Sequence, residues 1–405
     1  MSEPRRVVIT GLGAVSCIGI GVEAFVEGLR AGRTGFSPIR SFDASEFPSV
    51  VAAEVHDFDP AALVERLDPG QWGRSGQFAA AAARLAVRDA GIDPDLLSAR
   101  RTGSIMGTTA GESQVLQAAV EQWVGNGLKN VDPRLPGMTP VSQIANAVSY
   151  ELRLSGDSQT IPPACSASNM ALGYAFDLVR TGQADFMLAG GADAVNRACH
   201  AGFYRLGALA EQVCRPFDVN RSGIITGEGG AVLLLEPLDH ALARGARIYA
   251  EVLGYGVNCD AKHMVNPDAD SIAECIRIAH RYAGVRAEQI DYICAHGTGT
   301  PTNDLTEVKA VREVFGDRLP PVSSIKSMIG HTMGAASAFG AIACSKAIEE
   351  GFLPPTATVQ ELDPALGEGL DVVPGAARPA SVQVAQNQGL AFGGNNVVTI
   401  FGRLR

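Results

Sequence analysis

The regular alternation of short apolar, β-prone runs with stretches of helical periodicity is the feature that most constrains how this chain can fold. Strand-like runs occupy residues 6–10, 101–107, 159–161, 185–191, 229–236, 248–255, 291–295, 322–326, 384–387 and 393–402. Helical patterns lie between them, at residues 21–31, 77–90, much of 112–150, 166–179, 271–283, 303–315 and 334–350. This alternation predicts an α/β fold in which sheets and helices form layers.

Two glycine pairs, each followed by an apolar strand, indicate internal symmetry. Gly229-Gly230 precedes one such run, and Gly393-Gly394 precedes the other. A weak repeat of this kind is typical of a chain built from two similar halves. We therefore divide the chain into an N-terminal half at residues 1–245 and a C-terminal half at residues 246–405.

Composition excludes several classes of function. The chain has 405 residues, with 33 basic and 43 acidic side chains and a formal charge of −10, which argues against nucleic-acid binding. No apolar run reaches the roughly 18 residues of a membrane span, and the start of the chain is polar rather than signal-like. The eight cysteines form no C-x-x-C pair, so neither a zinc cluster nor a disulfide framework is indicated, and a reducing cytoplasm is expected.

A short glycine motif near the start of the chain raises nicotinamide binding as a possibility. Gly11-Leu12-Gly13 follows the first apolar run, as in dinucleotide-binding folds, but Ser16 stands where the third glycine belongs. A G-x-G pair alone is a weak signal, and we do not expect a nicotinamide cofactor.

Cys165 lies where a β-prone run gives way to a helical pattern. Unpaired backbone N–H groups and the positive end of a helix dipole meet at such a junction. A thiol there is expected to ionise more readily, and the thiolate is the nucleophilic form of cysteine. The alternative is a buried, inert cysteine that behaves as a small apolar side chain.

Two histidine motifs in the second half favour the nucleophile. His296 opens the run HGTGTPTND, and His331 closes the run SSIKSMIGH, each after an expected strand and beside glycine or hydroxyl residues. Such loops let backbone and hydroxyl groups approach a ligand closely. A metal site is the competing interpretation, but no H-x-x-x-H motif or His/Cys cluster has ligand spacing.

Taken together, these motifs resemble the β-ketoacyl-acyl-carrier-protein synthases, specifically the elongating type related to synthase II and the type II polyketide ketosynthases. The resemblance covers nearly the whole chain. It rests on the segments VITGLG at 8–13, ACS at 164–166, AGGAD at 189–193, RPFD at 215–218, GEG at 227–229, HGT at 296–298, KSMIGH at 326–331 and FGGNN at 392–396. It implies a thiolase fold, with two similar halves in five α-β-α-β-α layers, and a dimer.

The resemblance also implies a role for each matched residue. Cys165 would carry the acyl chain as a thioester, and the N–H groups of Cys165 and Phe392 would form the oxyanion hole. His296 and His331 would hold the malonyl thioester and stabilise the enolate left by decarboxylation, with Lys326 orienting this set. The expected substrate-binding residues are Thr298, Thr300, Ala110 and Phe203. The partner would be an acyl carrier protein, whose phosphopantetheine arm delivers the substrates, and no metal or other cofactor would be needed.

The chain departs from the family pattern at several points. The family usually has a glutamate where Gly340 stands, so a carboxylate near Lys326 is missing, and Asp304 or Glu307 is a candidate to compensate. Ala391 replaces a glycine in the turn before Phe392, and Ala110 replaces a bulkier pocket residue. The loop at residues 210–215 is short, and residues 71–74 lack the basic run that commonly meets an acidic carrier protein. These changes favour a specialised polyketide or polyene substrate.

Two other functions remain open from the sequence. One is a non-catalytic subunit, like a chain-length factor, although such subunits usually lose the nucleophile that Cys165 provides here. The other is an acyl-CoA thiolase, which would need a second active-site cysteine in the C-terminal half. An active synthase that works as a homodimer, or as a heterodimer with a chain-length-factor-like subunit, remains the leading hypothesis. Acyl chain length, unsaturation and the identity of the carrier protein are left undetermined.

Overall fold

The strands of each half follow the same order in space in a computed structural model of the chain. The structure describes residues 4–404. The first-half strands are β1 (Val7–Ser16), β5 (Thr102–Gly107), β6 (Ser158–Ile161), β7 (Phe186–Asp193) and β8 (Gly229–Pro237). The second-half strands are β9 (Ala250–Cys259), β10 (Tyr292–Cys294), β11 (Val322–Ser323), β14 (Val384–Leu390) and β15 (Asn395–Gly402). Their order is β11-β10-β14-β15-β9-β1-β8-β7-β5-β6, which reads the same from either end once the halves are matched.

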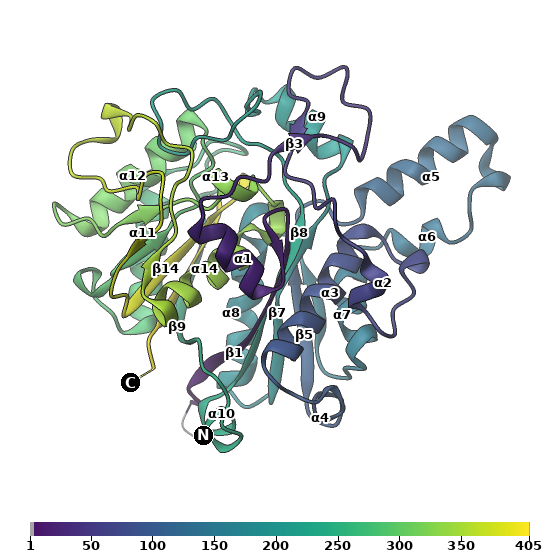
Figure 1. Cartoon of the computed structure of the whole chain (residues 1–405), viewed down its shortest axis with the longest axis horizontal. Coiled ribbons are helices and arrows are strands. Elements are labelled where there is room, and N and C mark those ends of the chain that lie inside the picture. Colours follow the sequence, from purple (N-terminus) through teal and green to yellow (C-terminus); the bar gives the residue numbers. More distant parts are fainter. Residues whose placement is uncertain (1–3, 405) are drawn as a thin grey trace.

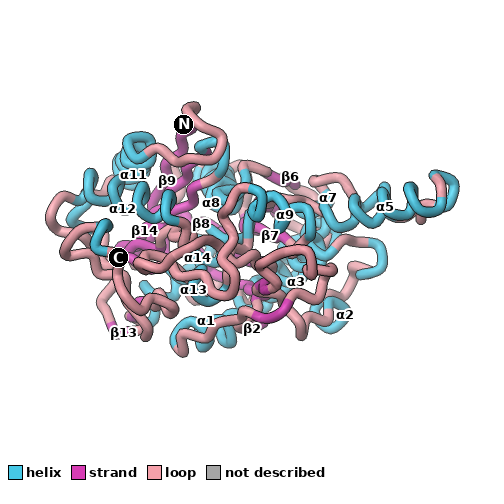
Figure 2. Tube along the Cα trace, turned by 90° about the horizontal axis from the view of Figure 1, so that it is seen from above, coloured by secondary structure: helices cyan, strands magenta, loops and turns pink. Residues whose placement is uncertain are grey.

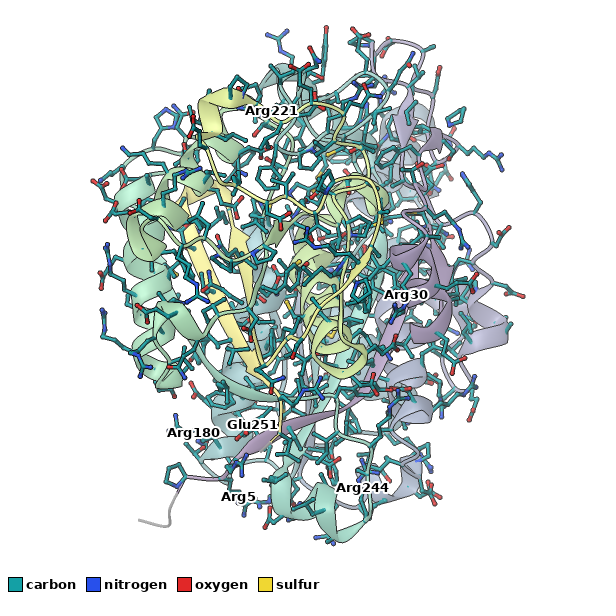
Figure 3. All side chains as sticks on the ribbon, turned by 60° about the vertical axis from the view of Figure 1, so that its left-hand side comes forward. Arg5, Arg30, Arg180, Arg221, Arg244 and Glu251 are labelled. Atoms are coloured by element: carbon teal, nitrogen blue, oxygen red, sulfur yellow. The ribbon has the colours of Figure 1, made fainter. Side chains whose placement is uncertain are left out.

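Strand directions repeat as well as strand order. Strand β5 runs parallel to both β6 and β7, and β10 runs parallel to both β11 and β14. The pairs β7–β8 and β14–β15 are antiparallel. The halves meet where β1 pairs with β9, and Arg6 and Glu251 form an ion pair beside that seam. Glu251 and Arg5 are labelled at the lower end of Figure 3.

Helices complete a five-layered arrangement around these strands. The main helices are α3 (Arg74–Asp89), α7 (Gln143–Leu152), α8 (Ala167–Arg180), α11 (Ala269–Ala283), α12 (Pro301–Phe315) and α14 (Ala336–Glu350). Helices α8 and α14 pack on each other at the centre and contact strands of both halves. Figure 1 shows α3 and α7 outside the first-half strands and α11 and α12 outside the second-half strands. The thiolase-like, five-layered α/β fold is thereby confirmed, while the division at residues 245 and 246 stays a proposal.

Smaller elements surround this frame. The short helices are α1 (Val22–Arg30), α2 (Pro60–Leu63), α4 (Pro94–Ser98), α6 (Leu135–Met138), α9 (Arg197–Arg205), α10 (Leu238–Ala243) and α13 (Lys326–Ile329). The short strands are β2 (Gly19–Ile20), β3 (Ser37–Pro38), β4 (Val51–Ala52), β12 (Phe352–Leu353) and β13 (Arg378–Pro379). A longer helix, α5 (Ser113–Asn126), projects away from the layers in both views (Figures 1 and 2). No helix in the described part of the chain is long and apolar enough to cross a membrane.

The Gly11-Leu12-Gly13 motif serves packing. It lies inside β1 rather than in a turn after a strand. A Cβ atom at Gly13 would lie 1.9 Å from the main-chain oxygen of Ala82, and one at Gly11 would lie 2.2 Å from that of Ala86. The two glycines therefore allow the alanine-rich helix α3 to lie directly against the strand, because any side chain would collide with the helix backbone.

Two predicted elements differ from the structure. The strand expected at residues 322–326 ends at Ser323, and Lys326 begins the short helix α13. The helical region expected at residues 112–150 divides into α5, α6 and α7, with a loop between them. Proline at the start of α6 and glycine at the end of α5 account for the breaks, because neither residue continues a helix well.

Candidate active site

Cys165 sits in a tight turn between β6 and the central helix α8. This Cys165 turn is a single 3-10 turn, Ala164–Ser166, and Ala164 has a φ of 52°. Non-glycine residues rarely adopt that left-handed conformation, and it costs on the order of 1–3 kcal/mol unless its surroundings enforce it. Cys165 is 4% exposed and stands ahead of α8, where the first backbone N–H groups have no partner within the helix.

The second half contains a turn of the same shape. This Met333 turn, Met333–Ala335, leads into the other central helix α14, and Met333 has a φ of 51°. His331 lies just before it and is held on both sides of its backbone by the segment 225–227. Its N–H donates to the carbonyl of Ile225 at 2.7 Å, and its carbonyl accepts the N–H of Gly227 at 2.9 Å. His331 therefore does not follow a strand directly, which the sequence analysis expected.

His296 follows β10 and is fixed by groups on two other elements. The carboxylate of Glu307, on α12, accepts the backbone N–H groups of His296 and Gly297 at 2.7 and 2.8 Å. The Nζ of Lys326 donates to the carbonyl of His296 at 2.5 Å, and Ser324 Oγ donates to that of Gly297 at 2.6 Å. The histidine backbone is thus clamped between an acid and a lysine, as expected for a loop that presents an imidazole.

Most of the predicted site residues line one cavity of about 180 Å³. They are Cys165, His296, His331, Thr298, Thr300, Phe203 and Phe392. The rings of His296 and His331 have centroids 5.5 Å apart at an angle of 81°, and Phe203 and Phe392 lie 5.5 Å apart at the same cavity. The structure therefore joins residues from both halves, which are far apart in sequence, around a single thiol.

Two predicted site residues do not line this cavity. Lys326 lies behind the wall, where it contacts the His296 carbonyl rather than the cavity. Ala110 lies on the turn after β5, where its N–H donates to the Asp193 carboxylate at 2.9 Å, and it is absent from the cavity wall. Its expected role in binding substrate therefore finds no support from the cavity of the single chain.

Sequence reasoning missed two walls of the cavity. They comprise Leu206, Gly207 and Ala208 after α9, and Val265, Asn266 and Pro267 after β9. The second segment is held near Phe392 by a hydrogen bond from the N–H of Gly393 to the carbonyl of Met264, 2.7 Å long. No sequence motif marks these loops, because their position depends on contacts with distant segments.

Burial sets the charge state of the site. Burial raises the pKa of the Cys165 thiol to about 12, and the nearby charge of Lys326 offsets only part of this. The sequence-based expectation of a readily ionised thiol is therefore wrong for this buried position. Burial, together with Lys326, also holds the pKa values of His296 and His331 well below 6.5. At neutral pH the site thus contains a thiol and two neutral imidazoles.

The tautomer of His331 follows from its hydrogen bond. Its Nδ1 accepts the backbone N–H of Met333 at 3.1 Å. A neutral imidazole whose Nδ1 accepts must carry its proton on Nε2. His331 is therefore a fixed N–H donor, whereas no described side chain or backbone group bonds to the ring of His296. One imidazole is committed to donating and the other is free to accept or donate a proton.

The missing carboxylate at Gly340 is not replaced by a direct ion pair. Asp304 accepts the backbone N–H groups of Phe217 and Gly299, and Glu307 accepts those beside His296. Within residues 4–404, neither acid forms an ion pair with Lys326. Arg221, labelled at the top of Figure 3, approaches Asp304 at 4.0 Å and pairs more closely with Asp363, at 2.5 Å. Burial lowers the pKa of Lys326, although Cys294 and Glu307 oppose this shift.

Residues 71–74, which lack the basic run that commonly meets an acidic carrier protein, form the end of a turn and the start of α3. Gln71 ends a 3-10 turn, and Arg74 Nη2 pairs with Glu228 Oε1 at 2.6 Å. The same Arg74 nitrogen also donates to the carbonyl of Val55 at 3.0 Å. This arginine is therefore committed to internal contacts.

Comparison with known proteins agrees with this geometry. Residues 4–241 match the family described as "Beta-ketoacyl synthase, N-terminal domain", and residues 249–360 match "Beta-ketoacyl synthase, C-terminal domain". The 3-oxoacyl-[acyl-carrier-protein] synthase 2 of Synechocystis sp. is 37% identical over 98% of both chains. The Nodulation protein E of Rhizobium sp. is 37% identical over 98% of this chain and 99% of its own.

Solved structures give the same result. The ishigamide ketosynthase/chain length factor structure is 49% identical over the whole of both chains, with a TM-score of 0.97. A type II PKS acyl-carrier protein in complex with its ketosynthase is 30% identical, again over both whole chains, with a TM-score of 0.90.

Proposed function

Because this chain belongs to the β-ketoacyl synthase family, we propose that it condenses malonyl-carrier protein with an acyl chain held on Cys165, giving a β-ketoacyl-carrier protein. The observation that carries the proposal is the single cavity in which a buried thiol faces two neutral imidazoles. A non-catalytic subunit would not need this set, and a thiolase would need a second cysteine. Cys165 is the one cysteine among the residues that line the described cavity.

Acyl transfer to Cys165 is the first step. The neutral His296 ring accepts the thiol proton as the sulfur attacks the acyl thioester, so that a free thiolate never has to exist in the buried site. The new S–C bond forms as the bond to the carrier sulfur breaks, and His296 passes the proton to that leaving sulfur. The N–H groups of Cys165 and Phe392, each in a 3-10 turn, stabilise the oxyanion.

Decarboxylation and condensation follow. The Nε2–H of His331 and an N–H of His296 donate to the malonyl thioester oxygen as the bond to carbon dioxide breaks. The enolate carbon then attacks the acyl carbon on Cys165, and the sulfur leaves. Thr298 and Thr300, whose hydroxyls lie 2.9 Å apart at the cavity, would bind the phosphopantetheine arm. The reaction needs no metal and no cofactor beyond that arm, and we place the protein in the cytoplasm.

The first prediction tests the nucleophile. Incubation with a panel of acyl-carrier thioesters is expected to add one acyl mass per chain, which peptide mapping places on Cys165. Cys165→Ala should remove the addition. Cys275→Ala, a buried cysteine on α11, should retain it.

Acylation that persists in Cys165→Ala would refute the proposal. The panel should contain saturated and polyunsaturated chains, because we propose a specialised polyketide or polyene substrate. Loading of saturated long chains alone would remove that refinement and leave the condensing activity in place.

A second chain of the same fold is the proposed partner. Helix α5 and the loop after it expose a row of large apolar side chains: Leu116, Val120, Trp123, Val124 and Leu128. Val124 is 81% exposed, and such contiguous patches mark interaction sites. Strand β6 is the last strand in the order of the sheet, so its outer edge has no partner strand within residues 4–404. The patch and the edge together fit another ketosynthase-fold chain, either a second copy or a chain-length-factor-like subunit.

The second prediction concerns this assembly. Trp123→Glu places a charge in the exposed row and is expected to shift the protein from dimer to monomer in native mass spectrometry. Leu242→Glu, which alters an exposed apolar side chain on α10, should leave the dimer intact. A wild-type chain that is monomeric alone but pairs with a neighbouring subunit would establish the heterodimer. A dimer unaffected by Trp123→Glu would exclude this surface.

A further inference from the structure

Gly340 lies in the middle of the central helix α14, where glycine is a poor helix former. Glycine is required at this position because a side chain from another element fills the adjacent space. A Cβ atom at Gly340 would lie 2.2 Å from Oδ1 of Asn387 and 3.1 Å from its Cγ. Asn387, on β14, therefore occupies the space that a residue at position 340 would need.

The Asn387 amide joins three buried elements. Its Nδ2 donates to Asn169 Oδ1 on α8 and to the Ser337 carbonyl on α14, both at 2.8 Å. Asn169 Nδ2 donates in return to the main-chain carbonyls of Asn387 at 3.2 Å and Val397 at 3.1 Å. Thr399 Oγ1 donates to the same Asn169 oxygen at 3.1 Å. Asn169 and Asn387 are almost fully buried, so the network is shielded from water.

The two residues that accept hydrogen bonds from Asn387, Asn169 and Ser337, both lie beside the Cys165 turn. Asn169 stands about one helical turn after Cys165 on α8. Ser337 Oγ donates to the Cys165 carbonyl at 3.1 Å. Ser168 Oγ, next to Asn169, accepts the N–H of Ala338 at 2.8 Å. The Asn387 amide therefore bonds to both sides of the contact between the Cys165 turn and α14. One bond goes to Asn169 on α8, and the other goes to the Ser337 carbonyl on α14.

We propose that Asn387 is a positioning residue that sets the place of Cys165 relative to the histidines, and that Gly340 is the space it requires. The inference rests on the proposed function only in treating Cys165 as the nucleophile. His331 and His296 are held by other groups, namely the segment 225–227, Glu307 and Lys326. Loss of the amide should therefore affect acyl transfer to Cys165 more than events at the histidines.

The test separates these two steps. Asn387→Ala is expected to slow acylation of Cys165 about 10- to 100-fold, because misplacing a reacting group by about 1 Å can cost that much. Decarboxylation of malonyl-carrier protein, measured after Cys165 has been alkylated, should change less than about threefold, since hydrogen-bond donors at the histidines are retained. Gln386→Ala is the matched control, because Gln386 lies next in β14 and bonds to His280 on the other face.

A second measurement tests the pairing of Gly340 with Asn387. Gly340→Ala should lower the thermal midpoint in the wild-type chain, where the new Cβ meets the amide. In the Asn387→Ala background the same change should lower the midpoint less, because the amide is gone and only the Sγ of Cys294, 3.3 Å from the Cβ position, remains close. Equal slowing of acylation and decarboxylation, or an effect on acylation no larger than that of Gln386→Ala, would overturn the proposal. Absence of acylation in the wild-type chain would instead refute the proposed function.

Discussion

Replacing His331 by alanine is expected to lower the condensation rate by about 10²- to 10³-fold, which is the usual cost of removing one preorganised donor to a developing oxyanion. The backbone N–H of Met333 holds Nδ1 of His331, so Nε2–H is the donor that the enolate loses. Acylation of Cys165 should fall less than about fivefold, because that step uses other donors. Separate assays of acyl transfer and of malonyl decarboxylation measure the two effects.

A matched histidine provides the control. His280 is also buried with a lowered pKa, but its ring bonds to Gln386 at 2.7 Å away from the cavity. His280→Ala should affect both steps alike, if at all. Burial holds the pKa values of His296 and His331 well below 6.5, so both rings stay neutral when the pH falls from 7 to 6.5. The wild-type condensation rate should therefore decline through protonation of these rings only at a pH well below 6.5. Equal losses of acylation and decarboxylation in His331→Ala would contradict the assigned role.

Replacing Glu151 by alanine should lower the free energy of unfolding by about 3 kcal/mol, because it removes the buried partner of Arg84 and leaves that arginine with the exposed Glu65, at 3.1 Å. Glu151 Oε1 pairs with Arg84 at 2.6 Å, and both side chains are nearly inaccessible to water. The same carboxylate accepts the backbone N–H groups of residues 65–67. The pair therefore ties α7 and α3 to the loop after α2.

Urea denaturation followed by tryptophan fluorescence can measure this effect. Trp72 lies 5.7 Å from the Tyr150 ring, beside Glu151, and reports on this region. Glu274→Ala is the matched control, since Glu274 also lies on a helix and pairs with an arginine, but in solvent. That change should cost less than about 1 kcal/mol. Similar effects of the two substitutions would show that the buried pair contributes no more than an exposed one.

The layered fold could be predicted from the sequence because its signal is local. Each buried strand is an apolar run, and the run expected at residues 185–191 became β7, Phe186–Asp193. The helices α3 and α14 could be predicted because both segments are rich in alanine, which favours a helix. Strand β11 was overestimated because its pairing with β10 covers only two residues, and the apolar pattern continues into α13.

The candidate site could be predicted in part. Cys165, His296 and His331 lie in motifs with distinctive neighbours, so their meeting at one cavity could be expected. The charge state could not, because the pKa of Cys165 depends on burial that no motif shows. The role of Asn387 was also hidden, since it depends on the close approach of β14 to α14 at Gly340. The charge state of Cys165 and the role of Asn387 both depend on where these residues lie in the fold, rather than on their residue type.

The matching Cys165 and Met333 turns have a consequence for how this catalyst can change over time. Each turn begins with a residue of nearly identical left-handed backbone, Ala164 and Met333, and each introduces one of the two central helices. A chain with two similar halves contains two copies of the same turn, and each copy can serve a different purpose. One turn presents the Cys165 sulfur, and the other follows the His331 imidazole. Because α8 and α14 pack on each other, a substitution that moves one turn is expected to displace the other.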